Sequence, residues 1–288
     1  MPKQLKLIHF VILLCLFVFA SSTYSVASQK DGLLKIHFFD IGQGDSIFIE
    51  TPSGYQILID GGPDNKVLSA IGSVMPFYDR DIDMVVASHP HSDHITGLMG
   101  VLDRYRVENI VEAKESYDSP QFLAWQEAVA GESAKETEPV IGKQINFDDG
   151  VVLYLLHPFQ SVAGTEESNP HNDVVVMMLW YGSLRVLLTG DMEARVENKL
   201  ILAGVDLDAD VLKVAHHGSK TSTTEDFLNK VTPQVGIIQV GAENKYGHPS
   251  AEVLERLGNY DIKVYRNDLN GDIKLISDGT DYLISSEK

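Results

Sequence analysis

Residues 87–98 read ASHPHSDHITGL and carry three histidines and an aspartate within six positions: His89, His91, Asp93 and His94. The residues just before them, IDMVVA at 82–87, form an almost continuous apolar run, which is typical of a strand buried on both faces. In layered α/β folds, ligands bind at the ends of such strands. Imidazole and carboxylate donors without cysteine suit zinc, manganese or iron. We interpret the stretch as part of a metal site, the alternative being a solvated polar loop.

A weak internal repeat extends outward from this stretch. Residues 46–62 predict a hairpin that ends at Asp60, and the histidine stretch follows after a connecting segment. Residues 174–191 predict a second hairpin that ends at Asp191, and DVLKVAHHGS follows at 210–219. Both halves therefore run hairpin, carboxylate, helix, buried strand, histidine. Two such units can pack sheet against sheet with helices outside, which predicts an α/β fold of the four-layer αββα type.

Composition limits the classes of protein to consider. The chain is 44% hydrophobic, which fits a globular domain with a sizeable core, and no low-complexity linker divides it after Lys30. A single domain over residues 31–288 is predicted. The formal net charge of −18 argues against broad binding to nucleic acid, although a local metal-filled cleft remains compatible with it. Cys15 is the only cysteine, so His, Asp, Glu or Asn must hold any metal.

The first residues have the pattern of a secretory signal peptide. Lys3 and Lys6 precede an apolar run at 7–20, and small and polar residues ending in SVAS follow. The run is short for a membrane span, which needs about 20 residues. We predict a signal peptide at residues 1–27 and a secreted or periplasmic protein without a stable membrane span, the alternative being an uncleaved N-terminal anchor.

The motifs resemble a known family. HPHSDH matches the HxHxDH signature of the metallo-β-lactamase fold superfamily. Further segments resemble the hydrolase domain of ComEC-type competence proteins, which take up DNA: FDIGQGDSIFIETPSGYQILIDGG, LLTGDM, LKVAHHGSKTS, GAENKYGHPSAEVLERL and VYRNDLNGDI. The resemblance covers roughly residues 33–280 and implies the metallo-β-lactamase fold. ComEC proteins also have a large membrane channel region that these residues do not match, so transport is not expected.

The resemblance also implies roles for individual residues. His89 and His91 would bind a first metal, Asp93 and His94 would bind a second, and Asp191 would bridge the two. His216 would be the final ligand because it directly follows the VLKVA strand, with His217 as the alternative. Asp60 would support the site through hydrogen bonds. The expected cofactor is one or two Zn²⁺ ions, with Mn²⁺ as an alternative.

One motif departs from the usual superfamily pattern. Most members have a third-motif histidine between the HxHxDH cluster and the bridging aspartate. The matching stretch here, NPHNDVVVMML, resembles the Asn-rich version of ComEC-like domains, with Asn172 and Asp173 in the pattern. Asn172 can substitute as a metal ligand, while His171 lies one place early and His157 on another strand end. Which of the three acts is left open, as is occupancy by a single metal.

These observations predict a secreted metal-dependent hydrolase. The expected reaction is attack of a metal-bound hydroxide on a phosphodiester, with extracellular DNA as the candidate substrate and Asp93 or Asp191 orienting the hydroxide. Three further side chains could contact a phosphate or carboxylate of the substrate: Lys220, Tyr246 and His248. The alternatives are a hydrolase of a small phosphoester such as choline phosphate, of a lactone or of a β-lactam, and a non-catalytic metal-binding domain. The sequence leaves the oligomeric state open.

Overall fold

The computed structural model describes Ile12, residues 31–165 and residues 169–288. Apart from Ile12, the predicted signal peptide at 1–27 lies outside this part of the chain. Among the residues described, no helix has both the length and the apolar character needed to span a bilayer. Residues Leu33–Lys288 form one compact unit.

Two twisted sheets make up the centre of this unit. The first has the order β15 (Tyr282–Ser286), β14 (Ile273–Ser277), β1 (Leu34–Phe38), β2 (Ile47–Glu50), β3 (Gln56–Ile59), β4 (Asp81–Ala87), β5 (Arg106–Glu112), β6 (Lys135–Thr137). The second has the order β13 (Lys263–Arg266), β12 (Val235–Ile238), β11 (Val211–Lys213), β10 (Leu184–Leu188), β9 (Val176–Tyr181), β8 (Val151–His157), β7 (Gln144–Asn146).

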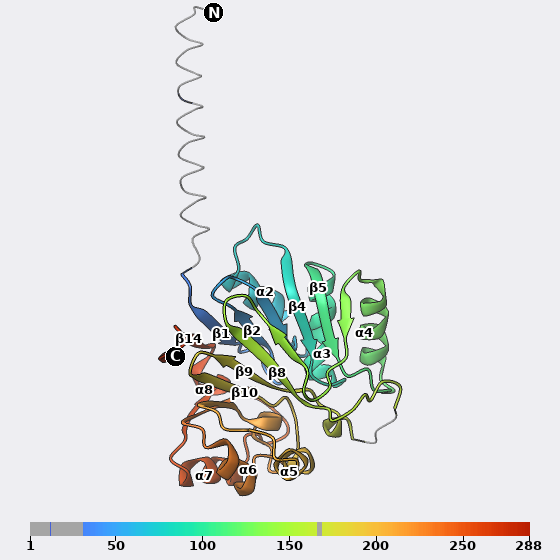
Figure 1. Cartoon of the computed structure of the whole chain (residues 1–288). Coiled ribbons are helices and arrows are strands. Elements are labelled where there is room, and N and C mark those ends of the chain that lie inside the picture. Colours follow the sequence, from blue (N-terminus) through green and yellow to red (C-terminus); the bar gives the residue numbers. More distant parts are fainter. Residues whose placement is uncertain (1–11, 13–30, 166–168) are drawn as a thin grey trace, which may run out of the picture. The chain divides into compact units, whose positions relative to one another are not determined.

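Helices cover the outer face of each sheet (Figure 1). The first sheet packs against α2 (Lys66–Val74), α3 (Ser92–Leu102) and α4 (Pro120–Gly131). The second packs against α5 (Ala194–Leu202), α6 (Glu225–Val231) and α7 (Ala251–Asn259), and the short α8 (Asn267–Asn270) follows β13. The order helix, sheet, sheet, helix is the predicted four-layer αββα sandwich, which is thereby confirmed.

The core lies in three apolar layers that follow from strand periodicity. Met84 and Val86 of β4 point into the layer between the sheets, while Val85 and Ala87 point into the layer under the helices. β4 is therefore buried on both faces, as its continuous apolar run predicts.

The internal repeat is visible in the topology. β2 and β3 form an antiparallel hairpin, and β4 returns parallel to β3 after the crossover helix α2. β9 and β10 form the second hairpin, and β11 returns parallel to β10 after α5. The two halves meet next to the histidine stretch, where the backbone N–H of Val175 donates to the carbonyl of Ser88 at 2.8 Å. The carboxyl ends of β3, β4, β10 and β11 thus lie at the same edge of the sandwich, next to the histidine stretch.

Candidate metal centre

The N-terminus of α3 presents the histidine stretch. His91 is the N-cap, and Asp93 and His94 occupy the first turn, where the helix dipole stabilises a carboxylate. The helix packs very closely on the turn after β3, because a Cβ atom on Gly97 would lie 1.9 Å from the carbonyl oxygen of Gly61. This contact fixes the position of the first turn of α3 relative to the end of β3.

Three histidines form a first donor set. His89 Nε2 lies 3.0 Å from His91 Nδ1, and His171 Nε2 lies 3.1 Å from the same atom. Burial lowers the pKa of His171 to about 4, and it also lowers the pKa of His89 and of His91. All three rings are therefore neutral at pH 7, as metal ligation requires.

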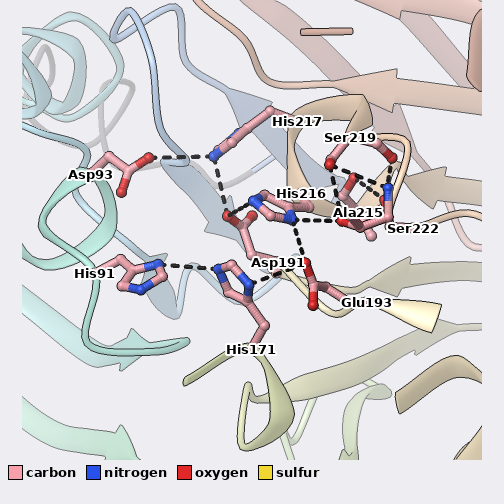
Figure 2. Close-up of polar contacts among 12 residues, drawn as sticks. His91, Asp93, His171, Asp191, Glu193, Ala215, His216, His217, Ser219 and Ser222 are labelled. Carbon is pink, nitrogen blue, oxygen red and sulfur yellow. Dashed lines mark hydrogen bonds and ion pairs between the residues drawn. The ribbon is translucent and has the colours of Figure 1, made fainter. Parts of the chain in front are cut away.

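A second donor set consists of Asp93, His94 and His217. His217 Nε2 lies 3.5 Å from Asp93 Oδ2. His94 Nε2 and His217 Nε2 each lie 3.3 Å from Asp191 Oδ2 (Figure 2 shows His217 between the two carboxylates). That oxygen is also 4.0 Å from His89 Nε2, so Asp191 stands between the two sets.

Buried acceptors hold the outward nitrogens of the second set. Asp60 accepts from His94 Nδ1 at 2.8 Å, and the carbonyl of Gln239 accepts from His217 Nδ1 at 2.9 Å. With Nδ1 engaged, each ring turns its Nε2 towards Asp191. Burial lowers the pKa of His94 and of His217, but Asp191 and the carboxylates behind the rings outweigh burial and raise it well above 6.5. A metal cation bound here would displace the extra protons of the His94 and His217 rings and would replace their positive charge.

The residues fit a divalent metal. Among the described residues, His94 Nε2, His217 Nε2 and Asp191 Oδ1 are buried without a hydrogen-bond partner. Unpaired buried polar atoms are costly, and these three belong to groups that surround one point. Imidazole nitrogens with carboxylate oxygens suit zinc, manganese and iron.

His216 and His217 adopt left-handed backbone conformations, with φ of 49° and 53°. Side chains disfavour this region, and the strained turn breaks the alternation of the preceding strand. His217 consequently points into the second donor set. His216 Nδ1 lies 3.5 Å from Glu193 Oε1, and His216 Nε2 lies 3.9 Å from Asp191 Oδ2 (Figure 2). The sequence favoured His216 over His217 for the position that His217 occupies.

The third motif contributes His171. Glu193 lies behind its ring, 3.6 Å from Nδ1, and Figure 2 shows the opposite side of the ring facing His91. Asn172 is buried in the same short turn, η1 (Pro170–Asn172), and does not line the cleft described below. His157 donates to the carbonyl of Val174 at 2.8 Å and lines a separate hollow of about 380 Å³.

Sequence reasoning missed a buried ion pair behind the centre. Lys213, fully buried in β11, pairs with the equally buried Asp45. Lys213 Nζ also donates to the carbonyl of Gly190 at 3.2 Å and lies 3.9 Å from Asp191 Oδ1, while Asp45 Oδ1 lies 3.3 Å from His217 Nδ1. The sequence did contain a sign of this ion pair, because Lys213 lies inside the apolar strand VLKVA.

The loop that carries Asp45 reaches the centre because of a glycine. Gly44 has φ of +129°, and a Cβ atom there would lie 2.1 Å from the carbonyl oxygen of Asp93. Gly44 of FDIGQGDS therefore allows this close approach of the two backbones.

Both donor sets open into one cleft of about 240 Å³. Its lining residues are Gln43, His91, Asp93, His171, Asp191, His216, His217, Tyr246 and His248. Of the three substrate contacts predicted, Tyr246 and His248 line the cleft, whereas Lys220 is exposed and does not.

Fold and site together define a metal-binding αββα protein. Residues 39–241 match the metallo-beta-lactamase superfamily, and the chain belongs to that family. The chain is 29% identical over 282 residues to ComE operon protein 3 of Bacillus subtilis, covering 90% of this chain and 35% of that protein. It is 31% identical over 270 residues to Recombination protein 2 of Haemophilus influenzae, covering 92% and 31%. It thus spans about a third of the length of these relatives.

Solved structures share the fold at low identity. A protein from Parabacteroides distasonis superposes with a TM-score of 0.50 at 15% identity, covering 82% of this chain and 93% of that one. CmlA from Streptomyces venezuelae, described as a diiron β-hydroxylase, superposes with a TM-score of 0.50 at 12% identity, covering 81% and 52%. Both likenesses support the αββα fold of this chain.

Proposed function

We propose that this chain is a metal-dependent phosphodiesterase that acts on DNA. The observation that carries the proposal is the pair of donor sets that share Asp191 and open into one cleft. The superfamily is generally one of metal-dependent hydrolases. The names of the relatives, Recombination protein 2 and ComE operon protein 3, together with the resemblance to competence proteins, favour DNA over other phosphodiesters.

We assign the first site to His89, His91 and His171, and the second to Asp93, His94 and His217, with Asp191 bridging them. Zn²⁺ or Mn²⁺ at these sites would activate water and neutralise charge on the phosphoryl group. Asp93 or Asp191 would orient the nucleophile. His216 Nε2 faces the same cleft, where it can hydrogen-bond a substrate oxygen while Glu193 holds its Nδ1 side.

Charge is consistent with this substrate only if metal is bound. The chain carries a net charge of −18, and Asp45, Asp60, Asp93 and Asp191 lie close together at the centre. Two dications would convert this region into one that attracts a phosphodiester. The chain by itself presents a repulsive surface, which favours short or single-stranded substrates over long duplex.

The N-terminus suggests where the reaction occurs. We propose that residues 1–27 direct export, leaving residues 31–288 as a hydrolase domain that is secreted or periplasmic. An uncleaved segment would instead keep the domain at the membrane. N-terminal sequencing of the protein recovered from its natural host distinguishes the two.

A metal-reconstitution panel tests the function. After chelation, the full chain should cleave single-stranded oligonucleotides and bis-p-nitrophenyl phosphate only when Zn²⁺ or Mn²⁺ is restored. The double variant His91→Ala/Asp191→Ala should lose this activity, and His37→Gln, a strand histidine outside the cleft, should keep it. Full activity of the double variant would contradict the proposal.

The same panel separates the alternatives. Turnover of a lactone or of nitrocefin without any phosphodiester cleavage would reassign the substrate. Release of choline phosphate from an envelope polymer, without cleavage of DNA, would favour the small phosphoester. Binding of metal without turnover of any ester would indicate a non-catalytic domain.

A further inference from the structure

A series of aromatic rings leads from the rim of the cleft to the metal centre. The Tyr246 and His248 rings are nearly parallel, with 15° between their planes and 5.8 Å between their centroids. The His248 ring lies 5.7 Å from that of His216, which lies 4.3 Å from that of His171. Tyr246 is the outermost member and is 57% exposed. The rim therefore offers a flat apolar face in line with the reacting centre.

Hydrogen bonds from Asn244 fix the backbone of the loop that carries Tyr246, while the Tyr246 ring stays exposed. Asn244 Nδ2 donates to the carbonyls of Gly241 and His248 at 2.9 and 2.7 Å. Asn244 Oδ1 accepts from the backbone N–H groups of Tyr246 and His248 at 3.2 and 2.9 Å. The half-buried amide of Asn244 thus ties both ends of the turn. A large ring left exposed forgoes the free energy of burial, which a stacking ligand would recover.

A cation accompanies the ring. Lys245 Nζ lies over the Tyr246 ring, 5.3 Å from its centroid, at the end of a flexible side chain that a stacking base can displace. An aromatic face beside a lysine is the combination with which proteins bind single-stranded nucleic acid, because the ring stacks on a base and the ammonium meets the backbone phosphate. Duplex DNA hides its base faces within the helical stack, so such a site discriminates between the two forms.

We propose that Tyr246 is a stacking platform for the nucleobase next to the phosphodiester in the cleft, with Lys245 at the flanking phosphate. The inference rests on the proposed function, and it names its substrate class as single-stranded nucleic acid or an unpaired end. Specificity then comes from the base as well as from the phosphate.

Two oligomers of equal charge test the platform. Binding of fluorescent oligothymidylate of eight residues is compared with binding of an abasic oligomer of the same length, both with a cleavage-resistant phosphorothioate backbone, by anisotropy on the Zn²⁺-loaded full chain. Charge repulsion cancels in the ratio of affinities. Wild type should prefer the base-containing oligomer roughly ten-fold. Tyr246→Ala should bring the ratio towards one, and Tyr246→Phe should restore it.

Phe77→Ala is the matched control, because Phe77 is an aromatic residue, 86% exposed, that does not line the cleft. Its ratio should equal that of wild type. Absence of preference or of any binding in wild type, or an unchanged ratio in Tyr246→Ala, would overturn the platform. Metal-loaded cleavage of the same oligomers with phosphodiester backbones separates this from the proposed function: equal cleavage of both oligomers removes the platform alone, and cleavage of neither removes the function.

Discussion

His171 and Asn172 are neighbours in one short turn, but their side chains have different surroundings. Asn169 accepts from the backbone N–H of His171 and holds the turn, while Pro170 restricts its first residue. His171 Nε2 meets His91, whereas Asn172 Oδ1 is buried without a hydrogen bond among the described residues. Position in the motif alone could not decide between them, because a turn rotates consecutive side chains apart.

We expect His171→Ala to lower bound zinc from two ions per chain towards one, since the first set loses one of its three nitrogens. Asn172→Ala should retain two. Elemental analysis after dialysis against near-stoichiometric zinc measures both. Loss of metal from Asn172→Ala together with retention by His171→Ala would reverse the assignment.

Lys213→Met should destabilise the metal-free protein by up to about 3–5 kcal/mol, because it removes the ammonium partner of Asp45 and leaves this buried carboxylate with His217 Nδ1 at 3.3 Å. The double variant Asp45→Asn/Lys213→Met removes both charges and should recover much of the loss. Urea unfolding of the chelated proteins measures the difference. Equal stability of the single and double variants would show that the pair is not a unit.

At the scale of elements, alternation and turn residues were enough to predict both hairpins and the buried strands β4 and β11. The helix α3 was not predicted, because its sequence carries metal ligands where a strong cap and amphipathic pattern would be expected. Strands β14 and β15 were also not predicted, since β14 pairs with β1 across more than 200 positions and β15 joins the sheet only by pairing with β14. The sequence could not show that His217, instead of His216, joins the second donor set, because this depends on a left-handed turn that composition does not reveal.

The segment after β5 contains a buried acid whose charge should affect stability. Burial, opposed by its own backbone and aided by Asp173 and Glu112, raises the pKa of Glu115 to about 8 from 4.5. The folded state therefore holds this proton more tightly than the unfolded state. The contribution of Glu115 to the free energy of unfolding is complete below about pH 4.5 and is lost as pH rises towards 8.

Glu115→Gln should consequently gain stability relative to wild type as pH rises from 5 to 8, by up to about 1.4 kcal/mol per pH unit. Urea unfolding at four pH values gives the difference, and Glu127→Gln on the exposed side of α4 is the control. Parallel pH profiles for wild type and Glu115→Gln would show that Glu115 is ionised in the folded state.

At the scale of the molecule, neither donor set belongs to one half of the repeat. His89 and His91 come from the first half and His171 from the second, and Asp93 and His94 likewise meet His217. Recognising two similar halves in the sequence was therefore sufficient to predict where the site lies, although not which donor each turn contributes.

We expect metal to stabilise the whole domain. Zinc at 100 times its dissociation constant should add about 2.7 kcal/mol, measured as a higher melting temperature than in chelator. His171→Ala/His217→Ala should lose most of this increase, and His248→Ala, outside both sets, should keep it. An increase that persists in the double variant would place the metal elsewhere.

The division of donors between the halves has a consequence for how the protein matures. An emerging chain that has completed only its first half holds incomplete sets, so firm capture of metal must await synthesis and docking of the second. For a chain exported unfolded, as we propose here, that moment falls after translocation. The ion would then be drawn from the compartment in which folding finishes, and the metal supply of that compartment, more than ligand chemistry, would decide which element the protein carries.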